Sequence, residues 1–154
     1  MHKKIASFMQ LHYLIIGLFI VMGIILIGEY VKQDTRDNII TSNLDSIFQL
    51  EFNQTASIES ENLKVRFLNV TEESRCSSDV VCVWEGQIII VINIFKDNKN
   101  LGEFNLVSRA AHEDLAIKDF GGYSVKLIKV EPYPKTISPI KTSDYTATLI
   151  VSKV

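Results

Sequence analysis

An apolar run near the amino terminus constrains this chain more than any other feature. Residues 11–28 are apolar, aromatic or glycine apart from His12, and residues 14–27 contain no charged or strongly polar side chain. A helix of about 18 residues is about 27 Å long, close to the roughly 30 Å hydrocarbon thickness of a bilayer. Apolar side chains on every face argue against a buried helix of a soluble protein. We therefore predict a transmembrane helix over residues 11–28.

The charges that flank this run predict its orientation. Lys3 and Lys4 precede the run, whereas residues 29–37 carry charges of both signs. Positive charge collects on the cytoplasmic side of membrane helices. We therefore expect residues 1–10 in the cytoplasm, residues 11–28 in the lipid bilayer of the cell membrane, and the rest of this single-pass chain outside the cytoplasm.

A signal peptide that is removed after export is the alternative to an uncleaved signal anchor. Basic residues followed by an apolar run are compatible with both. The run is long for a signal peptide, however, and no Ala-x-Ala-like cleavage site follows Ile27. No cysteine follows the run for lipid attachment either. The sequence therefore favours an uncleaved anchor.

Length and charge bound the remainder of the chain. The 154 residues allow one domain beyond the anchor, because about 100 residues are enough to bury a core. The formal net charge is −2, and no run of basic residues is longer than Lys3-Lys4. Phosphate binding requires clustered Lys and Arg. We therefore exclude nucleic acid as a partner.

The residue pattern of the chain changes at residue 47. Residues 29–46 are mostly polar and are typical of a stalk. After residue 46, short stretches alternate apolar with polar side chains and are rich in β-branched and aromatic residues, which predicts strands. A turn is expected at residues 97–100, where Asn and Asp tolerate positive φ. The predicted strands cover, in order, residues 47–52, 56–59, 63–68, 87–95, 101–107, 123–127 and 145–152.

About seven short strands and no helical stretch long enough for a βαβ unit predict an all-β fold. We expect residues 47–154 to form one antiparallel β-sandwich outside the cytoplasm. Residues 108–122 have no clear period and are expected to be an irregular loop with at most one helical turn. Pro132, Pro134 and Pro139 predict an extended loop before the last strand.

Residues 73–86, named here the cysteine loop, hold both cysteines and the only tryptophan. Outside the cytoplasm, Cys76 and Cys82 are expected to form a disulfide. So short a ring is worth about 2 kcal/mol, so the bond shapes the loop more than it holds the domain together. Zinc binding is disfavoured because a structural site needs four ligands and no second Cys or His pair stands at usable spacing. The spacing is also not that of a Cys-x-x-Cys redox pair.

The cysteine loop resembles a motif of small exported bacterial and archaeal domains that have no assigned function. It reads Ser74-Arg75-Cys76-x-x-Asp79-Val80-x-Cys82-Val83-Trp84-x-Gly86, after an alternating strand and before an apolar one. The motif of those domains is written around Arg-Cys-Pro and Cys-x-Trp-Ala-Gly, and this chain differs at Ser77 and Glu85. The likeness covers residues 47–154. It implies a β-sandwich outside the cytoplasm and supplies no activity, substrate or cofactor.

Five side chains of the cysteine loop are candidates for contact with a partner: Arg75, Asp79, Val81, Trp84 and Glu85. For Arg75 and Asp79, an ion pair or turn bonds within the loop are favoured over ligand contact. Trp84 is expected to pack on the core or to cover the disulfide. Glu85 is a candidate carboxylate that faces a ligand.

Two Asn-x-Thr triplets, at Asn53 and Asn69, satisfy the pattern for glycosylation. Export makes their modification possible. A glycan on Asn69 would keep the nearby rim of the cysteine loop solvated.

His112-Glu113-Asp114 is the one place where an imidazole meets carboxylates. A metal ion or a general base there would need partners that only folding brings together. The chain has none of the serine-hydrolase, zinc-protease or phosphate-binding motifs. We therefore expect no catalytic residues, no bound metal and no cofactor.

These features favour a membrane-anchored binding or interaction module. Apolar residues of the cysteine loop, Val80, Val81, Val83 and Trp84, motivate this hypothesis, with a protein at the cell surface or in the membrane as partner. An accessory subunit of a membrane complex, which would pack through residues 11–28, is the alternative. A metal-dependent or hydrolytic enzyme centred on His112 is the third hypothesis.

Overall fold

A computed structural model describes residues 15–23 and 38–154. Residues 15–23 form a helix. The expected transmembrane segment, residues 11–28, lies partly outside the described residues. Among the residues that are described, no helix is both long and apolar enough to cross a membrane. The transmembrane helix and the membrane location therefore stay predictions.

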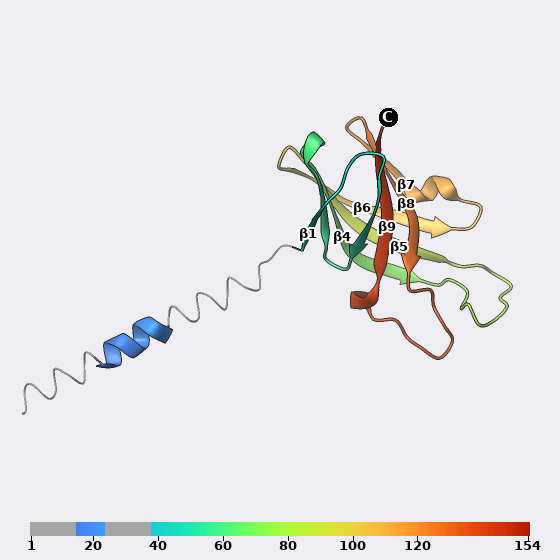
Figure 1. Ribbon diagram of the computed structural model, residues 1–154. Helices are drawn as coiled ribbons and strands as arrows, with labels where there is room; N and C mark the ends of the chain where they lie inside the picture. Colours follow the sequence, from blue (N-terminus) through green and yellow to red (C-terminus); the bar gives the residue numbers. More distant parts are fainter. Residues whose placement is uncertain (1–14, 24–37) are drawn as a thin grey trace, which may run out of the picture. The chain divides into compact units, whose positions relative to one another are not determined.

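Residues 38–154 form a unit of their own, in which the described chain folds into nine strands and two sheets (Figure 1). The first sheet has five strands, and β1 pairs with β3 in parallel while all its other neighbours are antiparallel. In spatial order its strands are β1 (Ile39–Thr41), β3 (Thr55–Ile58), β4 (Leu63–Glu73), β5 (Gln87–Lys96) and β6 (Lys99–Arg109).

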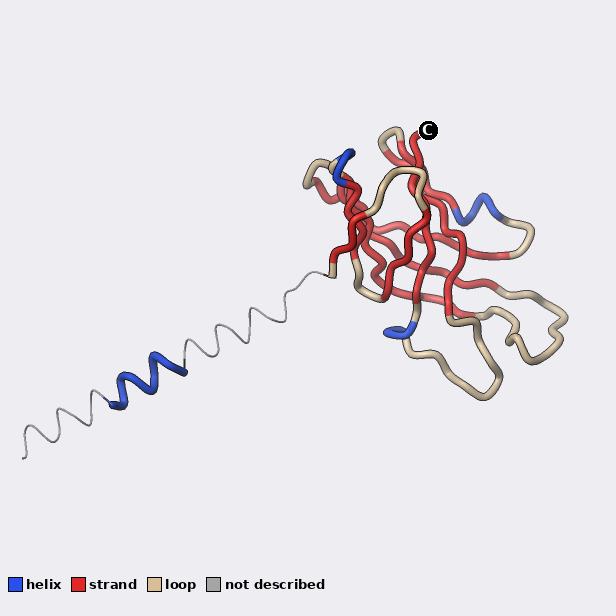
Figure 2. The backbone as a smooth tube through the Cα atoms, in the orientation of Figure 1, coloured by secondary structure: helices blue, strands red, loops and turns tan. Residues whose placement is uncertain are grey.

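The second sheet has four antiparallel strands. In spatial order they are β2 (Ile47–Glu51), β9 (Thr146–Lys153), β8 (Tyr123–Glu131) and β7 (Ile117–Phe120). Short 3₁₀ helices connect strands at Glu59–Glu61, Glu113–Ala116 and Thr142–Asp144, and the rest of the unit is loop (Figure 2). The predicted all-β fold is confirmed.

The core lies between the two sheets and follows from alternation along the strands. Alternate residues are buried in β2, over most of β5, in the first half of β8 and in the first half of β4, at Leu63, Val65 and Phe67. Because successive side chains of a strand point to opposite faces, the buried set of each strand meets the facing sheet. The largest fully buried side chains are Phe67, Leu50, Ile58, Leu63, Ile88, Ile90, Ile92, Ile94, Leu106, Leu149, Val65 and Val125.

The folded unit begins earlier than predicted, so the expected stalk over residues 29–46 is wrong in its second half. The backbone N–H of Thr55 donates to the oxygen of Asn38 at 3.0 Å, and β1 extends this pairing. The N–H of Asp45 donates to Val151 at 2.8 Å, which fixes the following turn to β9. β1 is only three residues long and lies in a mostly polar segment. Its pairing with β3 therefore decides its conformation.

The other new strand, β7, lies in residues 108–122, where an irregular loop was expected. The helical turn predicted in this region is present as the 3₁₀ helix Glu113–Ala116. It leads directly into β7, which pairs with β8 from Ile117↔Lys126 to Phe120↔Tyr123. Only four residues long, β7 has too few alternations to be read from sequence.

A polar cluster joins the sheets at the end of the sandwich opposite the cysteine loop. Tyr123 of β8 donates to the carboxylate of Glu61, and the Nζ of Lys153 in β9 lies 2.9 Å from the other oxygen of that carboxylate. The hydrogen bond from Tyr123, and then that from Lys153, lower the pKa of Glu61. The same bond to Glu61 raises the pKa of Tyr123.

Candidate functional site

The cysteine loop begins as a continuation of the β4–β5 hairpin. The N–H of Ser74 donates to the oxygen of Gln87 at 2.8 Å, and that of Cys76 donates to Glu85 at 3.0 Å. Cys76 and Cys82 then close a disulfide whose Cα atoms are 5.9 Å apart. The predicted disulfide is confirmed, and it forms a small ring at the tip of a hydrogen-bonded stem.

Gly86 allows the two arms of this stem to approach each other. Its φ is +68°, and a Cβ atom added there would lie 1.8 Å from the backbone oxygen of Ser74. No real side chain tolerates that distance, and positive φ is costly for other residues. The stem therefore requires glycine at position 86.

Arg75 anchors the base of the loop to both sheets. Its guanidinium forms a two-armed ion pair with Glu73, including a bond from Nε to Oε1 at 2.8 Å. It also donates to the backbone oxygens of Val130 at 2.7 Å and Pro132 at 3.0 Å, where β8 ends. Its Cζ lies 4.5 Å from the centre of the Tyr133 ring. Only 7% of the Arg75 side chain is exposed, so this candidate contact residue holds the loop in place.

Tyr145 completes this anchor from the start of β9. Its hydroxyl donates to Oε2 of Glu73 at 3.1 Å, and the side chain is buried. Burial, followed by the negative charge of Glu73, raises the pKa of Tyr145 to about 12. The hydroxyl therefore stays protonated and remains a donor to the carboxylate across the physiological range.

Asp79 ties the tip of the cysteine loop to the loop between β8 and β9. Its Oδ1 accepts bonds from the N–H of Thr136 at 3.1 Å and from the hydroxyl of Thr136 at 2.9 Å. The N–H of Ser78 donates to Pro134 at 2.9 Å beside it. The bond from the backbone of Thr136, and then that from its hydroxyl, hold the pKa of Asp79 below its usual value. Asp79 was expected to bond within its own loop, whereas these bonds run to a second loop.

The apolar side chains of the cysteine loop are exposed. Val81, Val83 and Trp84 are 101%, 94% and 82% exposed, and Val80 is half exposed. The expectation that Trp84 packs on the core or covers the disulfide is wrong. The loop projects past the ends of the strands (Figure 1).

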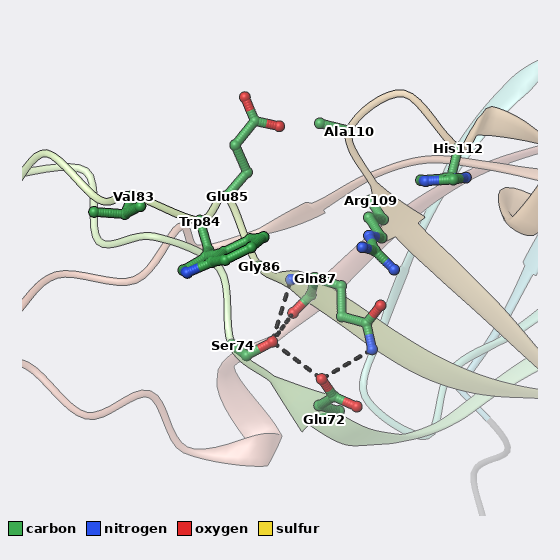
Figure 3. A pocket seen from close by; sticks show the side chains of 10 residues that line it. All are labelled: Glu72, Ser74, Val83, Trp84, Glu85, Gly86, Gln87, Arg109, Ala110 and His112. Carbon is green, nitrogen blue, oxygen red and sulfur yellow. Dashed lines mark hydrogen bonds between the residues drawn. The ribbon is translucent and has the colours of Figure 1, made fainter.

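A pocket of about 590 Å³ lies where the cysteine loop meets the end of β6. Trp84 lies on one side of it and Arg109 and His112 on the other, with Glu72 and Gln87 between them (Figure 3). Glu72 accepts bonds from the Gln87 amide at 2.9 Å and from the Ser74 hydroxyl at 3.0 Å. These bonds order the floor of the pocket, whereas Glu85 extends from its rim into solvent (Figure 3).

Sequence reasoning missed Glu72, Gln87 and Arg109 as pocket residues. Glu72 and Gln87 face one another across the hairpin, and Arg109 is the β6 partner of Gln87, so pairing across three strands gathers them. His112 is exposed at the far side of the pocket. Within the described part of the chain, no group of three or more His, Cys, Asp and Glu side chains is placed to hold a metal ion.

Both glycosylation candidates are exposed. Asn53 lies in the turn between β2 and β3 with φ +64°, and its Oδ1 accepts a bond from Arg66 at 3.4 Å. Asn69 lies within β4, beside a register shift, and its side chain accepts a bond from the N–H of Val70 at 2.9 Å. Glycosylation of either residue stays a prediction.

Comparisons with protein-family models, with curated proteins and with solved structures gave no match. The resemblance of the cysteine loop to the motif of exported domains therefore stays a prediction, and the functional argument depends on the geometry of this chain alone.

Replacing Arg75 with Ala is expected to lower the free energy of unfolding by about 3 kcal/mol or more, because Glu73 would keep its charge and its bond from Tyr145 but lose its cationic partner. Lys129→Ala is the control: Lys129 pairs with Glu131 at 3.7 Å with both side chains 52% exposed. Its loss should stay below about 1 kcal/mol. Urea unfolding of both variants measures the difference, and similar losses would contradict the anchoring role of Arg75.

Gly86→Ala should destabilise the protein by about 2 kcal/mol or more, since the new Cβ clashes with Ser74 and positive φ disfavours alanine. Gly122→Ala is matched to it: φ is +82°, but no atom lies within 4 Å of the added Cβ. That control should lose only about 1 kcal/mol, the cost of the conformation alone. Denaturant midpoints compare the two, and a larger loss for Gly122→Ala would contradict the close approach at the stem.

Thr136→Val should raise the pKa of Asp79 toward its usual value without reaching it, because the hydroxyl donor is lost and the N–H donor remains. A lowered pKa in the folded state means that the contact stabilises the protein above the unfolded pKa of about 4 and is lost as pH falls through the lower folded value. Carboxyl chemical shifts followed by NMR measure this titration. Thr142→Val, an exposed threonine of the same loop, is the control, and an unchanged Asp79 titration in Thr136→Val would contradict the contact.

Proposed function

We propose that this chain is a membrane-anchored binding module that presents its β-sandwich outside the cytoplasm and engages a partner through the cysteine loop. Residues 11–28 would serve as the anchor. One observation carries the proposal. A loop whose backbone is held by a disulfide, by the Arg75 anchor and by Asp79 nevertheless exposes several large apolar side chains.

The rigidity of the loop supports recognition. Ordering a flexible loop upon binding costs free energy, whereas a loop already held in place keeps more of its contact energy for the partner. The Arg75 anchor and the Asp79–Thr136 bonds restrain the loop at its base and near its tip. The exposed tip is therefore preorganised, as binding surfaces with aromatic anchors are.

The exposure of these apolar side chains supports the same proposal, because exposing them to water is unfavourable. Contiguous exposed apolar side chains mark interaction sites or aggregation hazards. Val81 lies within the disulfide-closed ring, and Val83 and Trp84 lie between Cys82 and the hydrogen-bonded stem at Glu85. The pocket beside Trp84 adds a hollow with charged and polar walls next to the apolar tip.

Photocrosslinking tests this function in the full chain. A benzophenone amino acid placed at position 81 should form adducts when membranes of the native host are irradiated. Mass spectrometry of the purified chain identifies the adduct, whether protein or lipid. Val81 is fully exposed, so the substitution removes no buried contact.

The matched control places the same group at Val154. This residue is also apolar and 81% exposed, but it lies at the opposite end of the sandwich, where its N–H donates to Gly122. Adducts at position 81 and few at position 154 are expected. Absence of adducts at position 81, or equal yields at the two positions, would refute the proposed function.

A further inference from the structure

Two neighbouring loops present apolar side chains at one end of the sandwich. Ile137 is 88% exposed and sits in a turn closed by the N–H of Ser138 on the oxygen of Lys135 at 3.2 Å. Thr136, next to Ile137, is bonded to Asp79 of the cysteine loop, next to Val80. The side chains of Val80, Val81, Val83, Trp84 and Ile137 are named here the two-loop surface.

The two-loop surface projects from the domain and is not recessed into it. Both loops extend beyond the ends of the strands at the same end of the sandwich (Figure 2). Val81, Val83 and Ile137 are 101%, 94% and 88% exposed, so few other side chains contact them. Apolar side chains on projecting loops are able to insert among lipid headgroups, where their apolar surface leaves water.

The charges around the tips suit a lipid surface as well. Lys135 and Lys141 are exposed on either side of Ile137, and lysine reaches anionic headgroups while its stem follows apolar groups. The carboxylate of Asp79 is turned toward Thr136. Glu85, which is exposed at the base of the loop, would remain among the headgroups and limit the depth of insertion.

Strand pairing locates the start of the folded unit along the first sheet. Ile39 is level with Thr55 and, through it, with Arg66 of β4. β1 runs toward the Leu63 end of β4, so Ile39 is the residue of β1 nearest the Glu73 end of β4, from which seven residues separate it.

The length of the tether between the predicted span and the folded unit decides whether the loop end of the sandwich can reach the bilayer. Residues 29–37 separate the predicted span from Asn38, and about nine residues reach at most about 32 Å when fully extended. Along β4, the seven steps from Arg66 to Glu73 span about 23 Å, which is shorter than that reach. A tether of this length therefore allows the loop end of the sandwich to touch the bilayer that holds the predicted span.

We infer that the two-loop surface rests in the headgroup region of the same membrane that anchors the chain. Trp84 and Tyr133, which is also exposed, are the residue types that favour membrane–water interfaces. Val80, Val81, Val83 and Ile137 supply the apolar contacts, and the Asp79–Thr136 bonds hold their two loops together. The inference rests on the proposed membrane anchoring and names lipid as the partner of the cysteine loop.

Trp84 is the only tryptophan, so its fluorescence reports this contact directly. The full chain is reconstituted into phosphatidylcholine–phosphatidylglycerol vesicles with or without bromine on the acyl chains. Trp84 in contact with lipid should emit at shorter wavelength and lose about half its intensity in brominated vesicles. Unquenched emission in vesicles that are shown to contain the chain overturns the inference. A chain that does not enter the vesicles overturns the membrane anchoring on which the inference rests.

The double variant Val81→Asp, Ile137→Asp should abolish this quenching, because carboxylates replace two apolar tips. Both positions are almost fully exposed, and an unchanged thermal unfolding midpoint confirms that the domain is intact. Ile47→Asp is the control, since Ile47 is 65% exposed on β2 and outside the two-loop surface. Quenching that survives the double variant, or that Ile47→Asp removes equally, overturns the inference.

The two proposals fail differently. Adducts with protein alone at position 81, together with unquenched Trp84, would leave the binding module standing and refute lipid as its partner. Quenching by brominated lipid together with lipid adducts at position 81 supports both. A chain without adducts and without quenching refutes both the binding function of the loop and its contact with lipid.

Discussion

The ion pair between Arg75 and Glu73 is the interaction on which the loop end of this sandwich depends. It joins the end of β4 to one carbonyl group near the end of β8 and one just after it, and Tyr145, which precedes β9, adds a hydroxyl to the Glu73 carboxylate. A buried charge without its partner is strongly destabilising, so the pair constrains both loops to one arrangement. The hairpin stem, the disulfide ring and the bonds between Asp79 and Thr136 all extend from that fixed point.

This anchor explains how the domain maintains apolar side chains in water. The short disulfide ring contributes only about 2 kcal/mol and cannot by itself position a loop of this length. Gly86 allows the close approach of the stem, and Arg75 fixes the stem to the second sheet. Val81, Val83 and Trp84 therefore stay exposed because the backbone that carries them is prevented from folding back onto the core. Both the proposed binding function and the proposed contact with lipid follow from this restraint.

Sequence patterns predicted the parts of this molecule that depend on neighbouring residues. Alternation located five of the seven expected strands within a few residues of their observed bounds at both ends, and export predicted the bond between Cys76 and Cys82. Patterns failed where a distant partner decides the structure. β1 and β7 are too short to show a period. Trp84 is exposed on a loop that extends past the strands, and Arg109 lines the pocket because β6 pairs with β5 at Gln87. Ile137 left a weak signal, as a single apolar residue in a polar, proline-rich loop.

By itself, the sequence determined the all-β class, the disulfide, the position of the cysteine loop and the expectation of an exported, anchored domain. These follow from local periodicity, residue chemistry and redox setting, which need no knowledge of distant contacts. Only the tertiary structure decided that Arg75 faces inward, that Trp84 faces outward, and that Ile137 lies beside the cysteine loop. The physical reason is that burial depends on which segments meet when the two sheets pack. Arg75 meets Val130 and Asp79 meets Thr136 through hydrogen bonds between residues some 55 positions apart, which no local pattern encodes.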